Sequence, residues 1–168
     1  MNSLATPWRS QYVEGQAGPR GSGQAEQSAK SCFFCDASAN PDDDDSLVVF
    51  EGADHLVLLN RFPYASGHLM VAPKNHRARP EDDSPATQAA FWPLVLRCRD
   101  ILNRAYQPDG FNLGMNLGSA AGAGVPDHYH FHIVPRWRGD TNFMSSVGEV
   151  RVIPEDSFAA RDRLRQLF

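Results

Sequence analysis

The sequence predicts an α+β domain whose strands pair as antiparallel hairpins. Short apolar runs of strand length are bounded by turn residues, and the first two runs are separated by one tight turn. Apolar residues at helical spacing are confined to a long central segment and a segment at the C-terminal end. Hairpins with segregated helices are typical of the α+β class, and the chain has no internal repeat.

About five strands, one long helix and one C-terminal helix are expected in this order. The predicted strands cover residues 47–50, 56–59, 68–72, 111–116 and 128–134. The turn Glu51-Gly52-Ala53-Asp54 joins the first two strands, and Pro73 ends the third because proline cannot donate a hydrogen bond to a sheet. Residues 88–106 form the long helix and residues 156–168 the last one.

Length and composition fit one compact domain preceded by an arm. The chain has 168 residues, of which 42% are hydrophobic and 21% charged, and these are ordinary globular values. Residues 14–31 are rich in Gly, Ser, Gln and charge and predict a flexible surface segment. We therefore expect an N-terminal arm over residues 1–31 and the domain over residues 32–168.

The composition also argues against several classes of function. A formal net charge of −4 does not favour general binding to nucleic acid. We expect no membrane span, because the sequence contains no apolar run of about eighteen residues. We also expect no secretory signal, because no cationic segment is followed by an apolar core. Three cysteines do not make a disulfide framework, so the cytoplasm is the expected location.

The most informative stretch is residues 128–134, His-Tyr-His-Phe-His-Ile-Val. Because strand side chains alternate, a strand here places His128, His130 and His132 on one face, which is about 13 Å long at about 3.3 Å per residue. The three imidazoles indicate either a zinc site or a relay with a nucleophilic middle histidine. The alternative is a structural set, in which each buried ring needs a hydrogen-bond partner.

A loop rich in Gly, Ala and Ser leads into this stretch at residues 116–124. Small residues let the backbone approach a ligand closely, and exposed N–H groups suit phosphate oxygens. The loop is neither a Walker loop nor a Gly-x-Gly-x-x-Gly fingerprint. It therefore predicts phosphate binding beside the histidines rather than a P-loop or a Rossmann fold.

Together these segments resemble the histidine triad (HIT) family of nucleotide hydrolases and transferases. Residues 128–134 match its His-x-His-x-His-x-x signature, and residues 59–73 and 111–119 are similar to the family's preceding blocks. Three further segments resemble the bacterial diadenosine polyphosphate phosphorylase and hydrolase-like branch: residues 6–9, 135–143 and 152–154. The resemblance implies a HIT-like fold, an AMP-containing nucleotide substrate such as a dinucleoside polyphosphate, and a homodimer.

The resemblance also implies a role for each triad residue. His130 would attack the α-phosphorus of a nucleotide and form a nucleotidyl-imidazole intermediate. An imidazole pKa near 6.5 suits this role because much of the ring is neutral and nucleophilic at physiological pH. His132 would contact the phosphate, and His128 would hold the tautomer and orientation of its neighbour.

Further residues match the family's nucleotide- and phosphate-binding positions. They are Asn60 for the ribose, Asn116 for the phosphate side, the backbone of Gly122, Ala123 and Gly124 for phosphoryl charge, and Trp137 as a cap over the site. Many relatives carry Ser or Thr shortly before the triad, where this chain has Ala123 and Gly124. Ser119 lies further back and is the candidate replacement for that hydroxyl.

Residues 32–35, Cys-Phe-Phe-Cys, form the second motif. In a cytosolic protein, Cys-x-x-Cys is redox-active or metal-binding, and the strand-to-helix context of thioredoxin chemistry is missing here. HIT relatives with this motif complete a structural zinc site with the His of a Pro-x-x-His and with the first triad histidine. The resemblance therefore implies zinc at Cys32, Cys35, His76 and His128, with unligated buried thiols as the alternative. No organic cofactor is expected.

The leading hypothesis is thus an enzyme that works through His130. A non-catalytic nucleotide sensor or partner-binding module is the second class. A hydrolase with all three triad histidines on a catalytic zinc is the third, and it leaves Cys32, Cys35 and His76 without a purpose. The acceptor, water or inorganic phosphate, is not fixed by the residues.

Overall fold

The computed structural model describes residues 32–140 and 155–168. The predicted N-terminal arm lies outside the described residues, as do residues 141–143 and 152–154 of the branch-specific segments, so the domain boundary at residue 32 stays a prediction. Within the described ranges, no helix has both the length and the apolar character needed to cross a membrane.

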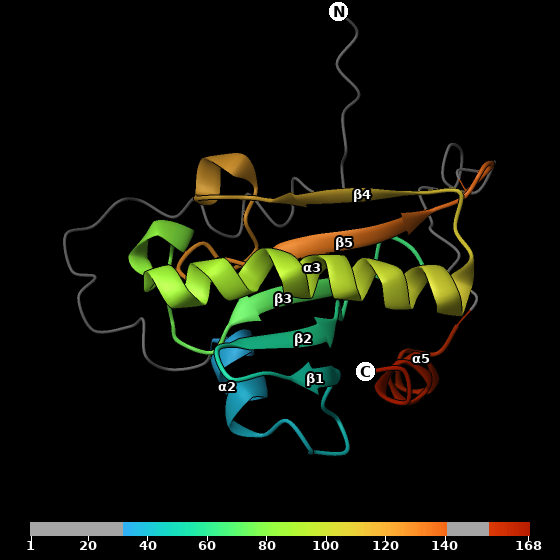
Figure 1. The fold of residues 1–168 in the computed structure, drawn as a ribbon, viewed down its shortest axis with the longest axis horizontal. Helices are drawn as coiled ribbons and strands as arrows, with labels where there is room; N and C mark the ends of the chain where they lie inside the picture. The colour runs from blue at the N-terminus through green and yellow to red at the C-terminus, as the bar shows by residue number, and fades with distance from the viewer. Residues whose placement is uncertain (1–31, 141–154) are drawn as a thin grey trace, which may run out of the picture. The chain divides into compact units, whose positions relative to one another are not determined.

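The described residues form one five-stranded antiparallel sheet, which confirms the predicted α+β class. Its strands are β1 (Val48–Glu51), β2 (His55–Leu59), β3 (Leu69–Pro73), β4 (Gly110–Met115) and β5 (Phe131–Arg136). Their order across the sheet is β1-β2-β3-β5-β4, and every neighbouring pair is antiparallel. The last strand in the chain therefore lies between β3 and β4 (Figure 1).

The described α-helices are α2 (Phe33–Ala39), α3 (Pro85–Tyr106) and α5 (Ser157–Arg165), and two short 3₁₀ helices lie at Pro80–Asp82 and Ser119–Ala121. Helix α3 starts three residues before the predicted residue 88. Ser84 caps it by accepting a hydrogen bond from the backbone N–H of Thr87 at 3.1 Å, and Pro85 occupies the first turn, where its missing N–H costs nothing. Helix α2, which the periodicity did not predict, is only seven residues long.

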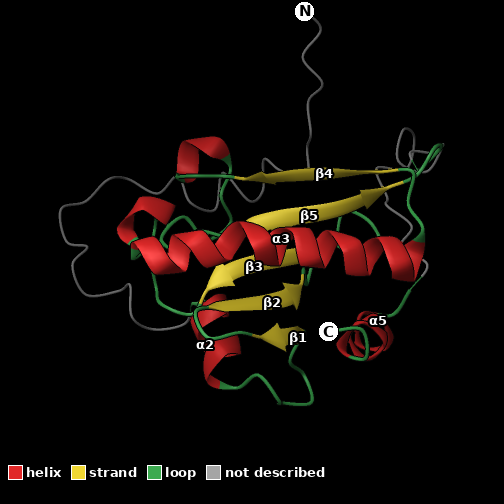
Figure 2. Cartoon of the chain, viewed as in Figure 1, coloured by secondary structure: helices red, strands yellow, loops and turns green. Residues whose placement is uncertain are grey.

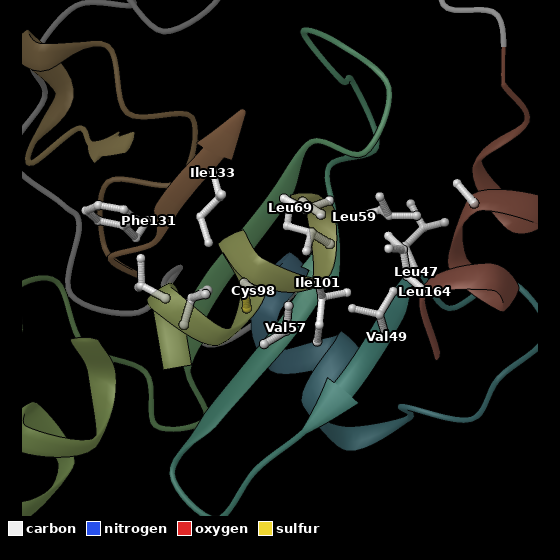
Figure 3. Close-up of a cluster of buried hydrophobic side chains, with 14 residues drawn as sticks. Leu47, Val49, Val57, Leu59, Leu69, Cys98, Ile101, Phe131, Ile133 and Leu164 are labelled. Atoms are coloured by element: carbon white, nitrogen blue, oxygen red, sulfur yellow. The ribbon is translucent and has the colours of Figure 1, made fainter. Parts of the chain in front are cut away.

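The two faces of the sheet are covered by different helices. Helix α3 runs across one face, and α5 packs beside β1 and β2 (Figure 2). The larger core lies between these helices and the sheet, and Figure 3 shows Val57, Leu69 and Ile133 of the strands meeting Cys98 and Ile101 of α3. The smaller core on the opposite face joins Phe34 of α2 to side chains from β1, β2 and β3.

The histidine stretch departs from the prediction in its boundary. The sequence predicts one strand over residues 128–134, but β5 begins at Phe131. The backbone N–H of Tyr129 donates to the carbonyl of Arg77 at 2.7 Å, and its hydroxyl donates to the buried carboxylate of Asp83 at 2.5 Å. These contacts with the segment after β3 hold Tyr129 out of the sheet ladder, so the strand starts two residues later.

The alternation itself is present on both sides of that boundary. The rings of Tyr129 and Phe131 lie 6.2 Å and 5.7 Å from that of Phe91 in α3, measured between centroids. The ring of His130 instead lies 4.7 Å from Phe34 of α2. Apolar residues thus face the larger core while the histidine between them faces the opposite side of the sheet.

Candidate functional site

The triad histidines gather on the sheet face that α3 does not cover. His128 and His130 are only 0% and 5% exposed, and both rings pack against Phe34, with centroid distances of 5.1 Å and 4.7 Å. His132 lies in β5 in register with Met70 of β3, which belongs to the same-side core. The structure therefore brings the three predicted residues together in one site.

A backbone carbonyl holds His130 in one tautomer. Nδ1 of His130 lies 2.9 Å from the carbonyl oxygen of His128, and because a carbonyl only accepts, Nδ1 carries the proton. Nε2 of the neutral ring then carries the lone pair. Burial lowers the pKa of His130, partly opposed by this hydrogen bond, so the neutral form dominates at neutral pH. A neutral, oriented imidazole of this kind can act as a nucleophile.

His132 is less buried than the other two triad histidines, and a fourth histidine forms a hydrogen bond with its ring. Its Nδ1 lies 2.9 Å from Nε2 of His68, and its ring centroid is 5.0 Å from that of His130. Burial first, and then the nearby His130, lower the pKa of His132 to about 4. The sequence did not predict the contact between His68 and His132 because the two residues are 64 positions apart in the chain.

Four further side chains form a cluster at the other end of the triad. One ligand atom from each of Cys32, Cys35, His76 and His128 lies within 4.8 Å of the other three. Nδ1 of His128 is 3.3 Å and 3.6 Å from the two sulfurs, and Nδ1 of His76 is 3.3 Å from the sulfur of Cys35. All four predicted ligands are thus adjacent.

Three of the distances between ligand atoms in this cluster, 3.3 Å, 3.3 Å and 3.6 Å, fall in the range expected for a tetrahedral zinc site. Bond lengths of about 2.3 Å to sulfur and about 2.0 Å to nitrogen place neighbouring ligand atoms about 3.3–3.8 Å apart. Nε2 of His128 donates to the carbonyl of Pro73 at 2.8 Å, which leaves Nδ1 as the acceptor facing the sulfurs. Burial lowers the pKa of His128 to about 4 and, with the adjacent Cys32, raises that of Cys35 to about 11. The residues present fit the metal.

Helix α2 positions the two cysteines. Cys32 is the N-cap residue, and its carbonyl accepts from the backbone N–H of Asp36 at 2.9 Å, so Cys35 follows in the first helical turn. Phe34 lies between them in the chain and is 2% exposed. The same short helix therefore supplies two sulfurs to the cluster and an aromatic ring to His130, a contact that sequence analysis did not identify.

The residues predicted to bind nucleotide lie at three places. The backbone N–H of Asn60 donates to the carbonyl of His68 at 2.9 Å, so Asn60 stands beside the triad face at the end of β2. Asn116 donates to the carbonyl of Gly122 at 3.5 Å across the loop that precedes the triad. Trp137 follows β5 at the opposite end from His130, with its ring centroid 6.4 Å from that of Tyr106.

The loop between β4 and β5 is the most exposed part of the site. Ser119 opens a single 3₁₀ turn (Ser119–Ala121), and Gly122 follows in the left-handed region at φ +83°, which a glycine adopts without strain. Gly122 and Gly124 are exposed, whereas Ala123 is buried. The loop thus exposes these two glycines to solvent.

This fold and this histidine site define a class, and comparison with known proteins names it. A HIT domain model matches residues 42–139. The chain belongs to the HIT domain family.

Similar proteins include enzymes and a metal-bound structure. An AP-4-A phosphorylase of Mycobacterium tuberculosis is 38% identical over 113 residues, which are 67% of this chain and 58% of that protein. An adenylylsulfatase of Arabidopsis thaliana is 32% identical over 126 residues, 74% of this chain and 62% of that protein. Both matches span less than two thirds of these relatives. A Zn-bound histidine triad family protein from Mycobacterium smegmatis has a TM-score of 0.66 at 30% identity, covering 82% of this chain and 92% of that one.

Proposed function

We propose that this protein is a nucleotide hydrolase or nucleotidyltransferase that forms a covalent nucleotidyl-His130 intermediate. Its substrates would be dinucleoside polyphosphates or related AMP-containing nucleoside phosphates. The observation that carries the proposal is the 2.9 Å hydrogen bond from Nδ1 of His130 to the His128 carbonyl, since it places the lone pair on Nε2. Similar proteins named AP-4-A phosphorylase and adenylylsulfatase support the substrate class.

The reaction would have two half-reactions at one phosphorus. In the first, Nε2 of His130 attacks the α-phosphorus, a P–N bond forms, and the P–O bond to the leaving group breaks with its electron pair on that oxygen. The ring becomes positively charged, and the carbonyl of His128 stabilises this charge through Nδ1–H. In the second, water or inorganic phosphate attacks the same phosphorus and loses a proton, the P–N pair returns to Nε2, and AMP or ADP is released.

The remaining predicted residues would bind the substrate around His130. The loop backbone at Gly122, Ala123 and Gly124 would lie against the phosphoryl oxygens, and the exposure of the two glycines supports this role. The N–H groups of Gly122 and Ala123 donate within the loop to the carbonyls of Ser119 and Gly118, at 3.0 Å and 3.4 Å, so a phosphate would have to replace these bonds. Asn116 and Ser119 would bind on the phosphate side of the same loop. His132 would contact the phosphate directly.

The nucleoside would extend from the phosphate toward the turn after β2. Asn60 stands beside the triad face and would contact the ribose. Trp137 as a cap stays a prediction from the resemblance, because it lies at the far end of β5 from His130.

The cysteine and histidine cluster would hold a structural zinc ion. Cys32, Cys35, His76 and His128 supply two sulfurs and two nitrogens that lie within 4.8 Å of one another, and zinc binds such donor sets as a structural crosslink. His128 belongs to this cluster and its carbonyl also fixes His130, so the cluster would position the nucleophile. The Zn-bound solved relative supports the choice of metal.

The arrangement favours this enzyme over the two alternatives. A catalytic zinc on the whole triad is disfavoured because both ring nitrogens of His128 are engaged elsewhere, Nδ1 with the two cysteine sulfurs and Nε2 with the carbonyl of Pro73. A non-catalytic nucleotide sensor would retain the fold and the binding residues but would not accumulate an adduct on His130. We further propose a homodimer, for which the half-exposed Trp92 and Leu96 of α3 offer apolar surface.

Product analysis with diadenosine tetraphosphate tests the proposal. The protein is incubated with and without inorganic phosphate, and the products are separated by chromatography. Release of AMP without phosphate shows a hydrolase, and release of ADP with a requirement for phosphate shows a phosphorylase. His130→Ala should abolish both, with the exposed Asn75→Ala as the matched control at full activity. Unchanged turnover by His130→Ala would refute the proposal.

A further inference from the structure

One peptide group beside the triad is hydrogen-bonded on both sides. Its carbonyl belongs to His128 and accepts from Nδ1 of His130 at 2.9 Å. Its N–H belongs to Tyr129 and donates to the carbonyl of Arg77 at 2.7 Å. Because a peptide group is planar, fixing the N–H also fixes the direction in which the carbonyl points. The orientation of the His130 ring therefore depends on a contact that Tyr129 makes outside the triad.

The side chain of Tyr129 makes a second contact with the same segment between β3 and α3. Its hydroxyl donates to Oδ2 of Asp83 at 2.5 Å, and the two residues are 2% and 9% exposed. Nε of Arg77 lies 3.9 Å from the other carboxylate oxygen of Asp83. Tyr129 is thus held at its backbone by Arg77 and at its side chain by Asp83, and these two residues form an ion pair with each other.

Asp83 is itself fixed at the start of the long helix α3. It directly precedes Ser84, the residue that caps α3. Its backbone N–H donates to the carbonyl of Pro80 at 3.2 Å, and its own carbonyl accepts from the side chain of Gln88 at 2.9 Å. The acceptor for the Tyr129 hydroxyl therefore belongs to a rigid element of the fold.

We propose that Tyr129 is a positioning residue for His130 and that it acts through its hydrogen bond to Asp83. The inference rests on the proposed function and deepens it. The bonds of Tyr129 to Asp83 and Arg77 restrain the peptide group whose carbonyl orients the His130 ring. If this peptide group loosened, the ring of His130 would rotate and change tautomer more freely. A smaller fraction of the enzyme would then hold the lone pair of Nε2 in line with the α-phosphorus.

The hydroxyl of Tyr129 can be separated from the packing of its ring. The ring lies on the α3 side of the sheet, with its centroid 6.2 Å from that of Phe91, whereas the triad histidines face the opposite side. Tyr129→Phe keeps this ring in the core and removes only the hydrogen bond to Asp83. The side chain also lies away from the substrate face, so the substitution removes no contact with a bound nucleotide.

Turnover of diadenosine tetraphosphate by two variants measures the effect on His130. We expect Tyr129→Phe to lower kcat about tenfold, the effect of one lost hydrogen bond, and to leave KM within about twofold. Asp83→Asn keeps an oxygen acceptor but removes its charge, so kcat should fall only about threefold. This milder variant also keeps the inference testable if Tyr129→Phe fails to fold.

Tyr106→Phe is the matched control. The hydroxyl of Tyr106 donates to Oε2 of Glu155 at 2.7 Å, so this substitution also removes a bond from a tyrosine to a carboxylate, but one that does not involve the triad. Its kcat should equal that of the wild type. Bound zinc is measured by elemental analysis in every variant and should match the wild type, so that any loss of kcat is not a loss of metal.

Nitrogen-15 NMR of the imidazoles provides a readout that a merely structural role would not move. In the wild type and in Tyr106→Phe, the ¹H–¹⁵N correlation pattern should show His130 protonated on Nδ1. In Tyr129→Phe, His130 should show a mixture of tautomers. Hydrogen exchange of the backbone amide of residue 129 should be slow in the wild type and faster in both Tyr129→Phe and Asp83→Asn.

The outcomes distinguish this inference from the proposed function. If the wild type turns over no dinucleoside polyphosphate, the proposed function fails, and the spectra and exchange rates still show whether Tyr129 restrains His130. If the wild type is active but Tyr129→Phe keeps its kcat and the tautomer of His130, the inference is overturned. Wild-type kcat and exchange in Asp83→Asn would also overturn it. An equal loss of kcat in Tyr106→Phe would assign the effect to general destabilisation and would overturn the inference as well.

Discussion

Replacing Gly67 by alanine should destabilise the fold through two separate terms. Gly67 has φ +70°, a region that costs an L-residue about 1–2 kcal/mol. A Cβ there would lie 2.7 Å from Cε2 of Tyr106 and 3.1 Å from Cδ2 of Leu102, both in α3. Overpacking of this kind typically costs about 1–3 kcal/mol. The expected loss in the free energy of unfolding is therefore about 2–5 kcal/mol.

Gly139→Ala is the matched control for the backbone term. Gly139 has φ +78°, and a Cβ added there would meet nothing within 4 Å, so only the cost of about 1–2 kcal/mol applies. Urea unfolding of the wild type and both variants, followed by circular dichroism, measures the midpoints and slopes. Both midpoints should fall at an unchanged slope, and the difference of about 1–3 kcal/mol between the variants isolates the clash with α3.

The reasoning would be refuted by equal destabilisation of the two variants, since the clash would then contribute nothing. A functional measurement on the same protein adds a second check. Gly67 precedes His68, so moving the backbone away from Tyr106 should disturb the 2.9 Å hydrogen bond to His132. We expect kcat of Gly67→Ala to fall while Gly139→Ala keeps the wild-type value.

Three other perturbations have defined outcomes. Tyr129→Phe removes a hydrogen bond to the buried Asp83 carboxylate and should lower the free energy of unfolding by about 1.5–3 kcal/mol. A double-mutant cycle with Asp83→Asn that shows no coupling between the two positions would contradict this. Cys35→Ser should lower both bound zinc, measured by elemental analysis, and Tm, whereas Cys98→Ser should keep the zinc; equal zinc content in both would contradict the assigned cluster. Because the pKa of folded His132 is about 4, below its unfolded value of about 6.5, the unfolded chain takes up the proton first. Stability should therefore fall as the pH drops from about 6.5 toward 4, and His132→Asn should show a shallower decline in urea unfolding; an identical pH dependence would contradict the lowered pKa.

The alternation of the histidine stretch was the part of the site most accessible from the sequence. Side-chain period two is a local property, so the shared face of His130 and His132 followed from residue order alone. The start of β5 did not, because the hydrogen bonds of Tyr129 to Arg77 and Asp83 come from a segment about fifty residues away. Such tertiary contacts override a local strand preference.

Two contributors to the site carried no local signal. Helix α2 is short and has no side-chain cap on its first turn, so neither hydrophobic periodicity nor a capping motif predicted it. Phe34 appeared only as a spacer within the cysteine motif, yet its ring packs on His130. Residue order placed His68 at the start of a predicted strand and left its role open, and only the pairing of β3 with β5 brings it to His132.

The metal ligands could be predicted only in part from the sequence. The spacing of Cys32 and Cys35 pointed to a metal or a redox pair, but the sequence by itself named no partners for them. His76 and His128 came from the family resemblance, and the structure places both beside the sulfurs. Ligands that are distant in sequence converge only through the fold, which is why residue order alone left the alternative of unligated thiols open.

The central claim is that Nε2 of His130 forms a bond to phosphorus, and trapping that bond tests it most directly. The protein is mixed with excess diadenosine tetraphosphate, quenched within milliseconds under conditions that preserve phosphoramidates, and analysed by mass spectrometry of the intact protein and its peptides. The account predicts one added adenylyl group on the peptide containing His130, absent from His130→Ala. Turnover without any adduct at the earliest times, or an adduct on another residue, would contradict it.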